Sequence, residues 1–141
     1  MRFWDSSALV ALHVEQAHTR LLRKAYKEDR WVPAWLQSDV EIRSAPCRLL
    51  REGTIGPEAF RDATERVESF WRTVHVVSLV EASKVRAKRL LAAHPLASAD
   101  ALQLGAALVG ARDEPLGWEI VTLDDRLGQA ARAEGFVVRP P

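Results

Sequence analysis

Short apolar stretches alternate along this chain with longer segments in which apolar residues recur every three or four positions. The first pattern is typical of buried strands and the second of helices that pack along one side. Residues 1–4, which are apolar except for Arg2, are followed by Asp5, Ser6 and Ser7, whose side-chain oxygens suit the cap of a helix. A helical pattern of apolar residues comes next. The chain is therefore predicted to open with a strand, a polar corner and a helix.

The same alternation continues to the end of the chain. Pro46 lies inside a predicted helix, which it should bend or deprive of one hydrogen bond, and Glu41 is placed near the middle of that helix. Residues 111–117 form a predicted surface loop. Helices are predicted over residues 17–27, 35–51, 57–72, 81–93, 98–109 and 124–133, and extended segments or strands over 31–33, 74–79, 118–123 and 136–138.

Strands that alternate with helices favour a parallel sheet covered on both faces, because parallel neighbours need a crossover connection of about helix length. The chain shows no internal repeat, low-complexity tract or linker. We therefore expect an α/β fold of three layers, α/β/α, with a short central parallel sheet, in a single domain that spans residues 1–141.

Composition narrows the class of protein. Of the 141 residues 48% are apolar, which is enough for a core without structural metals or disulfides, and the net charge of +1 means that any contact with nucleic acid must be local. Cys47 is the single cysteine and cannot form an internal disulfide, which indicates a reducing compartment. No apolar run approaches the ~20 residues that span a membrane. We expect a cytoplasmic protein without membrane contact.

Two acids occupy the polar corners that follow strands. Asp5 and Asp124 each come after an apolar strand, at the start of a helix, and ligands of open α/β sheets bind beyond the carboxyl ends of the strands. Two carboxylates held close together repel each other unless a cation lies between them, and hard divalent ions prefer oxygen ligands. These corners therefore predict a Mg²⁺ or Mn²⁺ pocket, with Ser6 and Thr122 as candidates for orienting the ligands.

Glu41 and Asp100 are the other two candidates, because each lies in a helical segment whose neighbours are largely apolar or small. A buried carboxylate must be paired, capped, neutralised or bound to metal. Taken alone, each acid also has an ordinary explanation: Asp5 and Asp124 as helix caps, and Glu41 as a solvated helix residue. Asp100 would be a charge in the first turn of a helix that Ser98 caps. The joint arrangement favours a site.

These acids lie in four stretches that together resemble the motifs of a known family. The first stretch has an aspartate followed by small hydroxyl residues and an apolar helix, and the later ones follow in the family's order and spacing over nearly the whole chain. The chain thereby resembles the PIN domains and, among them, the VapC-like toxins. The four stretches are residues 3–12 with Asp5, 38–45 with Glu41, 99–107 with Asp100, and 121–127 with Asp124.

The resemblance implies an endoribonuclease in which these four acids hold one or two Mg²⁺ or Mn²⁺ ions, with Asp125 ranked behind Asp124 as the fourth acid. The metal would bind the scissile phosphate, lower the pKa of an attacking water and stabilise the developing charge. The resemblance also implies the toxin of a toxin–antitoxin pair, an RNA substrate, a VapB-like antitoxin as partner and a homodimer. Gln103 and Gly105 stand where the family often has a histidine and an alanine.

The sequence is also compatible with two other functions. A receiver-like signalling module also uses an acidic pocket, but it needs an aspartate at the end of a central strand, and the predicted strand 74–79 ends without an acid. A non-catalytic PIN-like binding protein would not need all four acids.

Several side chains have two interpretations: Arg43, Arg48 and Arg126 as phosphate contacts or solvated charges, and Leu9, Leu12, Leu21 and Leu22 as an antitoxin groove or as core.

Overall fold

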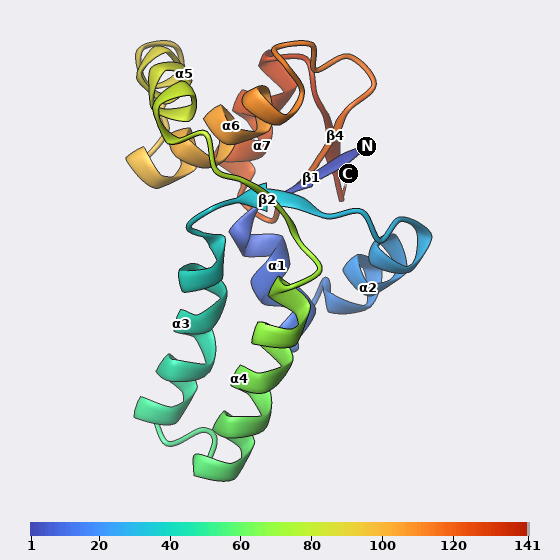
Figure 1. Ribbon diagram of the computed structural model, residues 1–141, viewed down its shortest axis with the longest axis vertical. Coiled ribbons are helices and arrows are strands. Elements are labelled where there is room, and N and C mark those ends of the chain that lie inside the picture. Colours follow the sequence, from blue (N-terminus) through green and yellow to red (C-terminus); the bar gives the residue numbers. More distant parts are fainter. Residues whose placement is uncertain (141) are drawn as a thin grey trace.

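The computed structural model describes residues 1–140, in which strands and helices alternate as expected (Figure 1). Helices α3 and α4 lie side by side and extend away from the sheet as a hairpin. The elements in chain order are β1 (Arg2–Trp4), α1 (Ser6–His13), α2 (Thr19–Glu28), β2 (Pro33–Trp35), α3 (Ser38–Arg51), α4 (Pro57–Trp71), β3 (His75–Val77), α5 (Val80–Ala93), α6 (Ser98–Gly110), β4 (Glu119–Val121), α7 (Asp125–Ala133) and β5 (Val137–Arg139).

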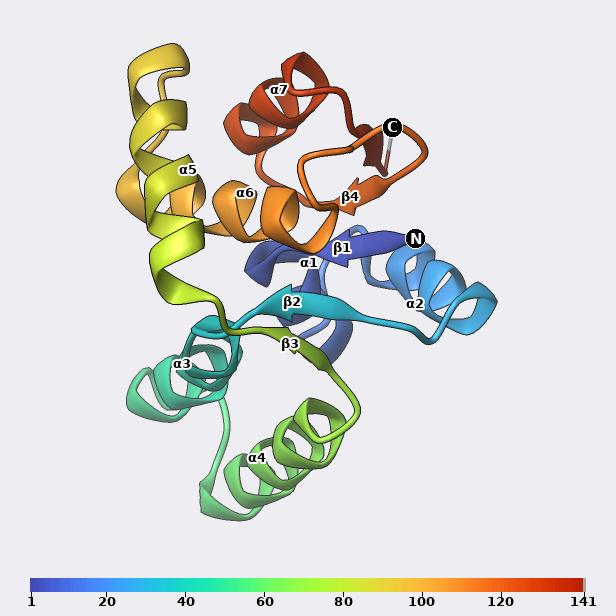
Figure 2. The same ribbon diagram turned by 45° about the horizontal axis from the view of Figure 1, so that its top comes forward.

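The strands are short and all their pairings are parallel. β4 lies between β1 and β5, with Ile120 opposite both Phe3 and Val138, and β2 pairs with β3. β2 also lies alongside β1, so that the two paired groups follow one another across the molecule (Figure 2). The predicted short central parallel sheet is confirmed.

Neighbouring residues of the strands point into two separate cores. Phe3, Trp35 and Ile120 belong to a cluster with side chains of α6 and α7, whereas Trp4 and Val121 belong to a cluster with side chains of α1 and α2. Because successive side chains of a strand face opposite sides of the sheet, each side needs its own cover of helices. The two cores establish the three-layer α/β/α fold.

The boundary between β2 and α3 differs from the prediction. The strand covers Pro33–Trp35 rather than 31–33, because this segment pairs with His75–Val77, and the helix begins only at Ser38. Proline is acceptable as the first residue of a strand, where its missing N–H is not needed. The later start moves Glu41 from the predicted middle of the helix to its first turn.

The prediction for Pro46 is confirmed, since it lies within a helix that continues to Arg51 and removes one hydrogen-bond donor from it. The cap of α6 is Ala97 rather than Ser98, which is the first helical residue. Leu22 is buried, whereas its neighbour Leu21 is exposed.

Helices α5 and α6 pack with their backbones in close contact. A Cβ atom added to Gly105 would lie 2.6 Å from the carbonyl oxygen of Ser83 and 3.1 Å from the backbone nitrogen of Ala87. This contact holds α6, which carries Asp100, directly against α5. None of the helices in residues 1–140 combines the length and the apolar character that a membrane crossing requires.

Candidate active site

One cavity is lined by all four acids that the sequence predicts. Asp5 follows β1 and caps α1, and Asp124 follows β4 and caps α7. Glu41 and Asp100 lie in the first turns of α3 and α6. Each acid thus stands at the start of a helix, where the partial positive charge of the helix N-terminus favours a carboxylate. The fold brings together residues that are far apart in the chain.

Asp5 is the most buried of the four acids, with 4% of its surface exposed. Its Oδ2 atom accepts hydrogen bonds from the backbone N–H of Ser7 at 3.2 Å, from the Ser7 hydroxyl, and from the Thr122 hydroxyl at 2.9 Å. Within residues 1–140 no hydrogen bond reaches Oδ1. Burial raises the pKa of Asp5 to about 6, the charge of Glu41 adds to this rise, and the bonds from Ser7 and Thr122 oppose it.

Asp100 and Asp124 form a second pair of coupled charges. Burial raises the pKa of Asp100, the negative charge of Asp124 raises it further, and the positive charge of Arg126 acts in the opposite direction. Oδ1 of Asp124 accepts a hydrogen bond of 2.7 Å from the backbone N–H of Leu127, which caps the helix. The cavity therefore holds two acidic pairs, one formed by Asp5 with Glu41 and one by Asp100 with Asp124.

The donor set of this cavity suits a hard divalent cation. Over the described part of the chain, no three His, Cys, Asp or Glu side chains lie close enough together to form a metal site. Mg²⁺, however, usually keeps several waters and takes only one or two carboxylates from the protein. Because carboxylates of like charge repel, a cation between the pairs would draw them closer together. The chemistry of the residues fits Mg²⁺ or Mn²⁺.

The hydroxyl residues around Asp5 have different partners. Thr122 donates to Asp5, whereas the Ser6 hydroxyl points to Ser38, with 2.9 Å between the two oxygens. Ser7, which sequence reasoning did not select, both donates to Asp5 and accepts a 2.9 Å bond from the backbone N–H of Leu123. The Asp-Ser-Ser cap pattern was the available signal for this residue. Ser7 and Thr122 together fix the orientation of the Asp5 carboxylate.

Gln103 is the second residue that sequence reasoning did not select. It is 2% exposed on α6, one turn after Asp100, and its amide reaches Ser6, Ser38 and Glu41. Its polarity within the otherwise apolar segment 101–108 could have identified it from the sequence. Asp100 was selected in that way, as a polar residue among apolar neighbours. Gln103 connects the helices that carry three of the four acids.

The remaining candidate residues, Asp125 and three arginines, differ in their position relative to the cavity. Asp125 is exposed and is not among the residues that line the cavity. Arg48 is exposed and lines the cavity, and the charge of Arg126 acts on Asp100. Arg43 instead forms an ion pair with Glu68 of α4. Arg48 and Arg126 are therefore the cations best placed to meet an anionic ligand.

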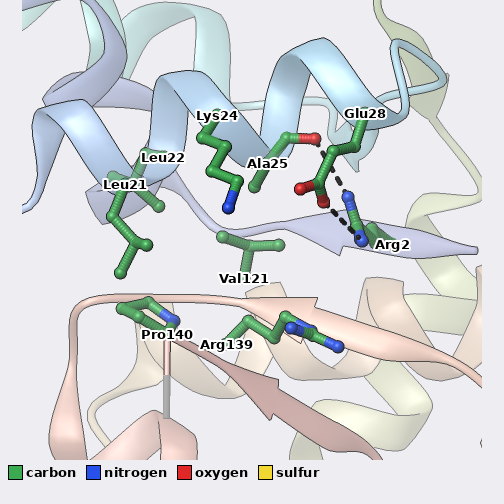
Figure 3. Close-up of a pocket in the computed structure, with 9 residues that line it drawn as sticks. All are labelled: Arg2, Leu21, Leu22, Lys24, Ala25, Glu28, Val121, Arg139 and Pro140. Carbon is green, nitrogen blue, oxygen red and sulfur yellow. Dashed lines mark hydrogen bonds and ion pairs between the residues drawn. The ribbon is translucent and has the colours of Figure 1, made fainter.

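A smaller pocket lies between α2 and the ends of β4 and β5 (Figure 3). Arg2 at its edge donates to the carbonyl of Ala25 and to Glu28, so the arginine is already engaged. Leu21 and Leu22 both line this pocket, but Leu22 is buried, as are Leu9 and Leu12, whereas Leu21 is exposed. Of the four leucines considered for a partner groove, Leu21 is thus the one with an exposed side chain.

The raised pKa of Asp5 predicts a pH-dependent effect of Asp5→Asn on stability. The Asp5 carboxyl loses its proton near pH 3.8 in the unfolded chain and at about pH 6 in the folded chain. Its ionisation therefore lowers the free energy of unfolding as the pH rises between these values. Asparagine keeps the helix cap without the charge. Without metal, the variant should be more stable than the wild type above about pH 6, by up to about 3 kcal/mol.

Thermal unfolding in EDTA between pH 4 and pH 8 measures this difference. The stability difference should become much smaller toward pH 4, where the folded chain keeps the proton on Asp5 and the unfolded chain begins to gain it. A difference that stays constant over this range would contradict the burial of an ionisable Asp5.

Comparison with known proteins identifies the family of this chain. No protein-family model matches the chain. The chain is similar to Ribonuclease VapC45 of Mycobacterium tuberculosis (strain CDC 1551 / Oshkosh) and to Ribonuclease VapC49 of Mycobacterium tuberculosis (strain ATCC 25618 / H37Rv). Each is 33% identical over 138 residues, which cover 98% of this chain and 94% of the relative. With the three-layer fold and this similarity over almost its whole length, the chain belongs to the VapC ribonucleases of the PIN-domain kind.

Proposed function

We propose that this protein is a metal-dependent endoribonuclease that hydrolyses phosphodiester bonds of RNA and is the toxin of a toxin–antitoxin pair. The observation that carries the proposal is the single cavity lined by Asp5, Glu41, Asp100 and Asp124. It occurs in a chain that is 33% identical to two ribonucleases over 98% of its length.

The four acids would hold Mg²⁺ or Mn²⁺, which binds the scissile phosphate, activates a water and stabilises developing charge. Asp5 would offer Oδ1, because Ser7 and Thr122 already occupy Oδ2. Asp124 would offer Oδ2, because the backbone N–H of Leu127 occupies Oδ1. One oxygen of each aspartate thus accepts hydrogen bonds from the protein, and the other would be available to the cation.

The same cavity offers contacts for an RNA backbone. Arg48 lines it and Arg126 lies near Asp100, so both would contact phosphates that flank the scissile bond. These local cations matter because the net charge of +1 provides no general attraction for a polyanion. Single-stranded or looped RNA suits the cavity, since its backbone reaches the acids without the opening of a duplex.

The proposal extends to the partners and setting of the protein. The chain would be a single PIN-like domain over residues 1–141, located in the cytoplasm. It would form a homodimer and bind a VapB-like antitoxin. Exposed Leu21 is a candidate contact for the antitoxin. Co-expression with a short DNA-binding protein from the neighbouring gene, followed by co-purification, tests the pairing.

Incubation of the purified chain with total RNA, with and without metal, tests the proposed activity. We expect fragments with Mg²⁺ or Mn²⁺, none with EDTA, and restored cutting when excess metal is returned, because the acids alone repel the phosphate. Cutting that persists in EDTA would contradict the metal mechanism. Binding without cutting in either metal would favour a non-catalytic PIN-like protein instead.

A further inference from the structure

Gln103 makes the most extensive side-chain contacts of the buried polar residues beside the acidic cavity. Its Nε2 lies 3.1 Å from Ser38 Oγ and 3.3 Å from Glu41 Oε1, and it also donates to Ser6 Oγ. Ser6 belongs to α1, which Asp5 caps, and Glu41 belongs to α3. One side chain of α6 therefore connects three of the elements from which the acids come.

Glu41 determines which way the Gln103 amide must face. The hydroxyls of Ser6 and Ser38 donate or accept equally well, so they would tolerate either end of the amide. An ionised carboxylate only accepts, so the NH₂ group must be the end directed toward Glu41. In this orientation Oε1 of Gln103 is buried without a hydrogen-bond partner in the described chain. The contacts of the NH₂ group must offset that unsatisfied oxygen.

We propose that Gln103 is a positioning residue, which holds the Glu41 carboxylate toward the cavity through its amide N–H and so sets the affinity of the cavity for a divalent cation. This inference rests on the proposed function, because it assumes that Glu41 contributes to a metal site. Groups that orient metal ligands typically change metal affinity by about 10-fold to 100-fold when they are removed. Gln103 is not expected to touch RNA or the ion itself.

Two substitutions separate the hydrogen bond from the volume of the side chain. Gln103→Met has a similar reach and lacks the N–H, whereas Gln103→His places a ring nitrogen at the reach of Nε2 and provides a donor. Gln129→Met is the matched control, because Gln129 is an exposed glutamine on α7. Calorimetric titration of each full-length protein with Mn²⁺ measures the affinity, and thermal unfolding in EDTA separately measures the effect on stability.

We expect Gln103→Met to bind Mn²⁺ about 10-fold or more weakly than the wild type, with Gln103→His close to the wild type and the control unchanged. If Gln103→Met does not fold, Gln103→Asn replaces it, since its amide is one methylene short of Glu41. Wild-type affinity in the donor-free variant, or equal losses in the Met and His variants, would overturn the inference alone. Absence of Mn²⁺ binding by the wild type would overturn the proposed function and, with it, this role of Gln103.

Discussion

Replacement of Asp5 by asparagine is expected to lower metal-dependent RNA cleavage by about three orders of magnitude. The substitution removes the charge of the most buried acid of the cavity and keeps the cap of α1, because asparagine caps helices as well as aspartate does. The variant should therefore fold and lose activity. Single-turnover cleavage of a labelled RNA in Mn²⁺ measures the rate, and the unfolding curve shows that the fold is intact.

Asp125→Asn is the matched control for this loss. Asp125 carries the same charge, lies next to Asp124 and was ranked behind it as the fourth acid, but it is exposed and does not line the cavity. Its substitution should leave the cleavage rate within about two-fold, as is usual for surface positions without special contacts. Equal losses in both variants would show that general negative charge, rather than the cavity, supports cleavage. An unchanged rate for Asp5→Asn would remove Asp5 from the mechanism.

The greatest loss of stability is expected for Gly105→Ala. The added Cβ would lie 2.6 Å from the carbonyl oxygen of Ser83, an atom of the α5 backbone that cannot rotate away. Overpacking of this kind costs about 1–3 kcal/mol, more than the ~1 kcal/mol that alanine gains over glycine inside a helix. We expect a lower free energy of unfolding, measured by urea denaturation with an unchanged m-value.

Gly110→Ala on the same helix is the control, since its Cβ would meet Val77 Cγ2 at 3.6 Å, an ordinary van der Waals distance. This variant should be as stable as the wild type or slightly more stable. If Gly105→Ala matched it, the close approach of α5 and α6 would be wrong. The contact also accounts for glycine at a position where the family resemblance led us to expect alanine.

The alternation of strands and helices was predictable because local patterns carry it. Phe3 and Trp4 alone indicated a strand buried on both sides. The segment around Trp35 was not predictable in the same way, since its apolar residues fit a strand and a helix equally well. Pairing of Pro33–Trp35 with His75–Val77 decides between them, and this contact joins residues about forty positions apart. The position of Glu41 within its helix depended on that contact.

The four acids that line the cavity could be named from the sequence, but most of their hydrogen-bond partners could not. Asp5 and Asp124 follow strands, and this local position was enough to select them. The network of Ser6, Ser38 and Gln103 joins three helices through hydrogen bonds between residues far apart in the chain, and no local pattern encodes such contacts. Only the polarity of Gln103 within an apolar helix was visible in advance.

The proposed mechanism requires that a divalent cation binds among carboxylates from separate elements. Anomalous diffraction from a crystal grown with Mn²⁺ locates the ion directly, because manganese is the strong scatterer at its absorption edge. We predict a peak inside the cavity, in coordination contact with Oδ1 of Asp5 and with at least one oxygen of Glu41, Asp100 or Asp124. A manganese peak elsewhere on the molecule, with the cavity empty under conditions in which the protein cuts RNA, would contradict a metal site formed by these acids.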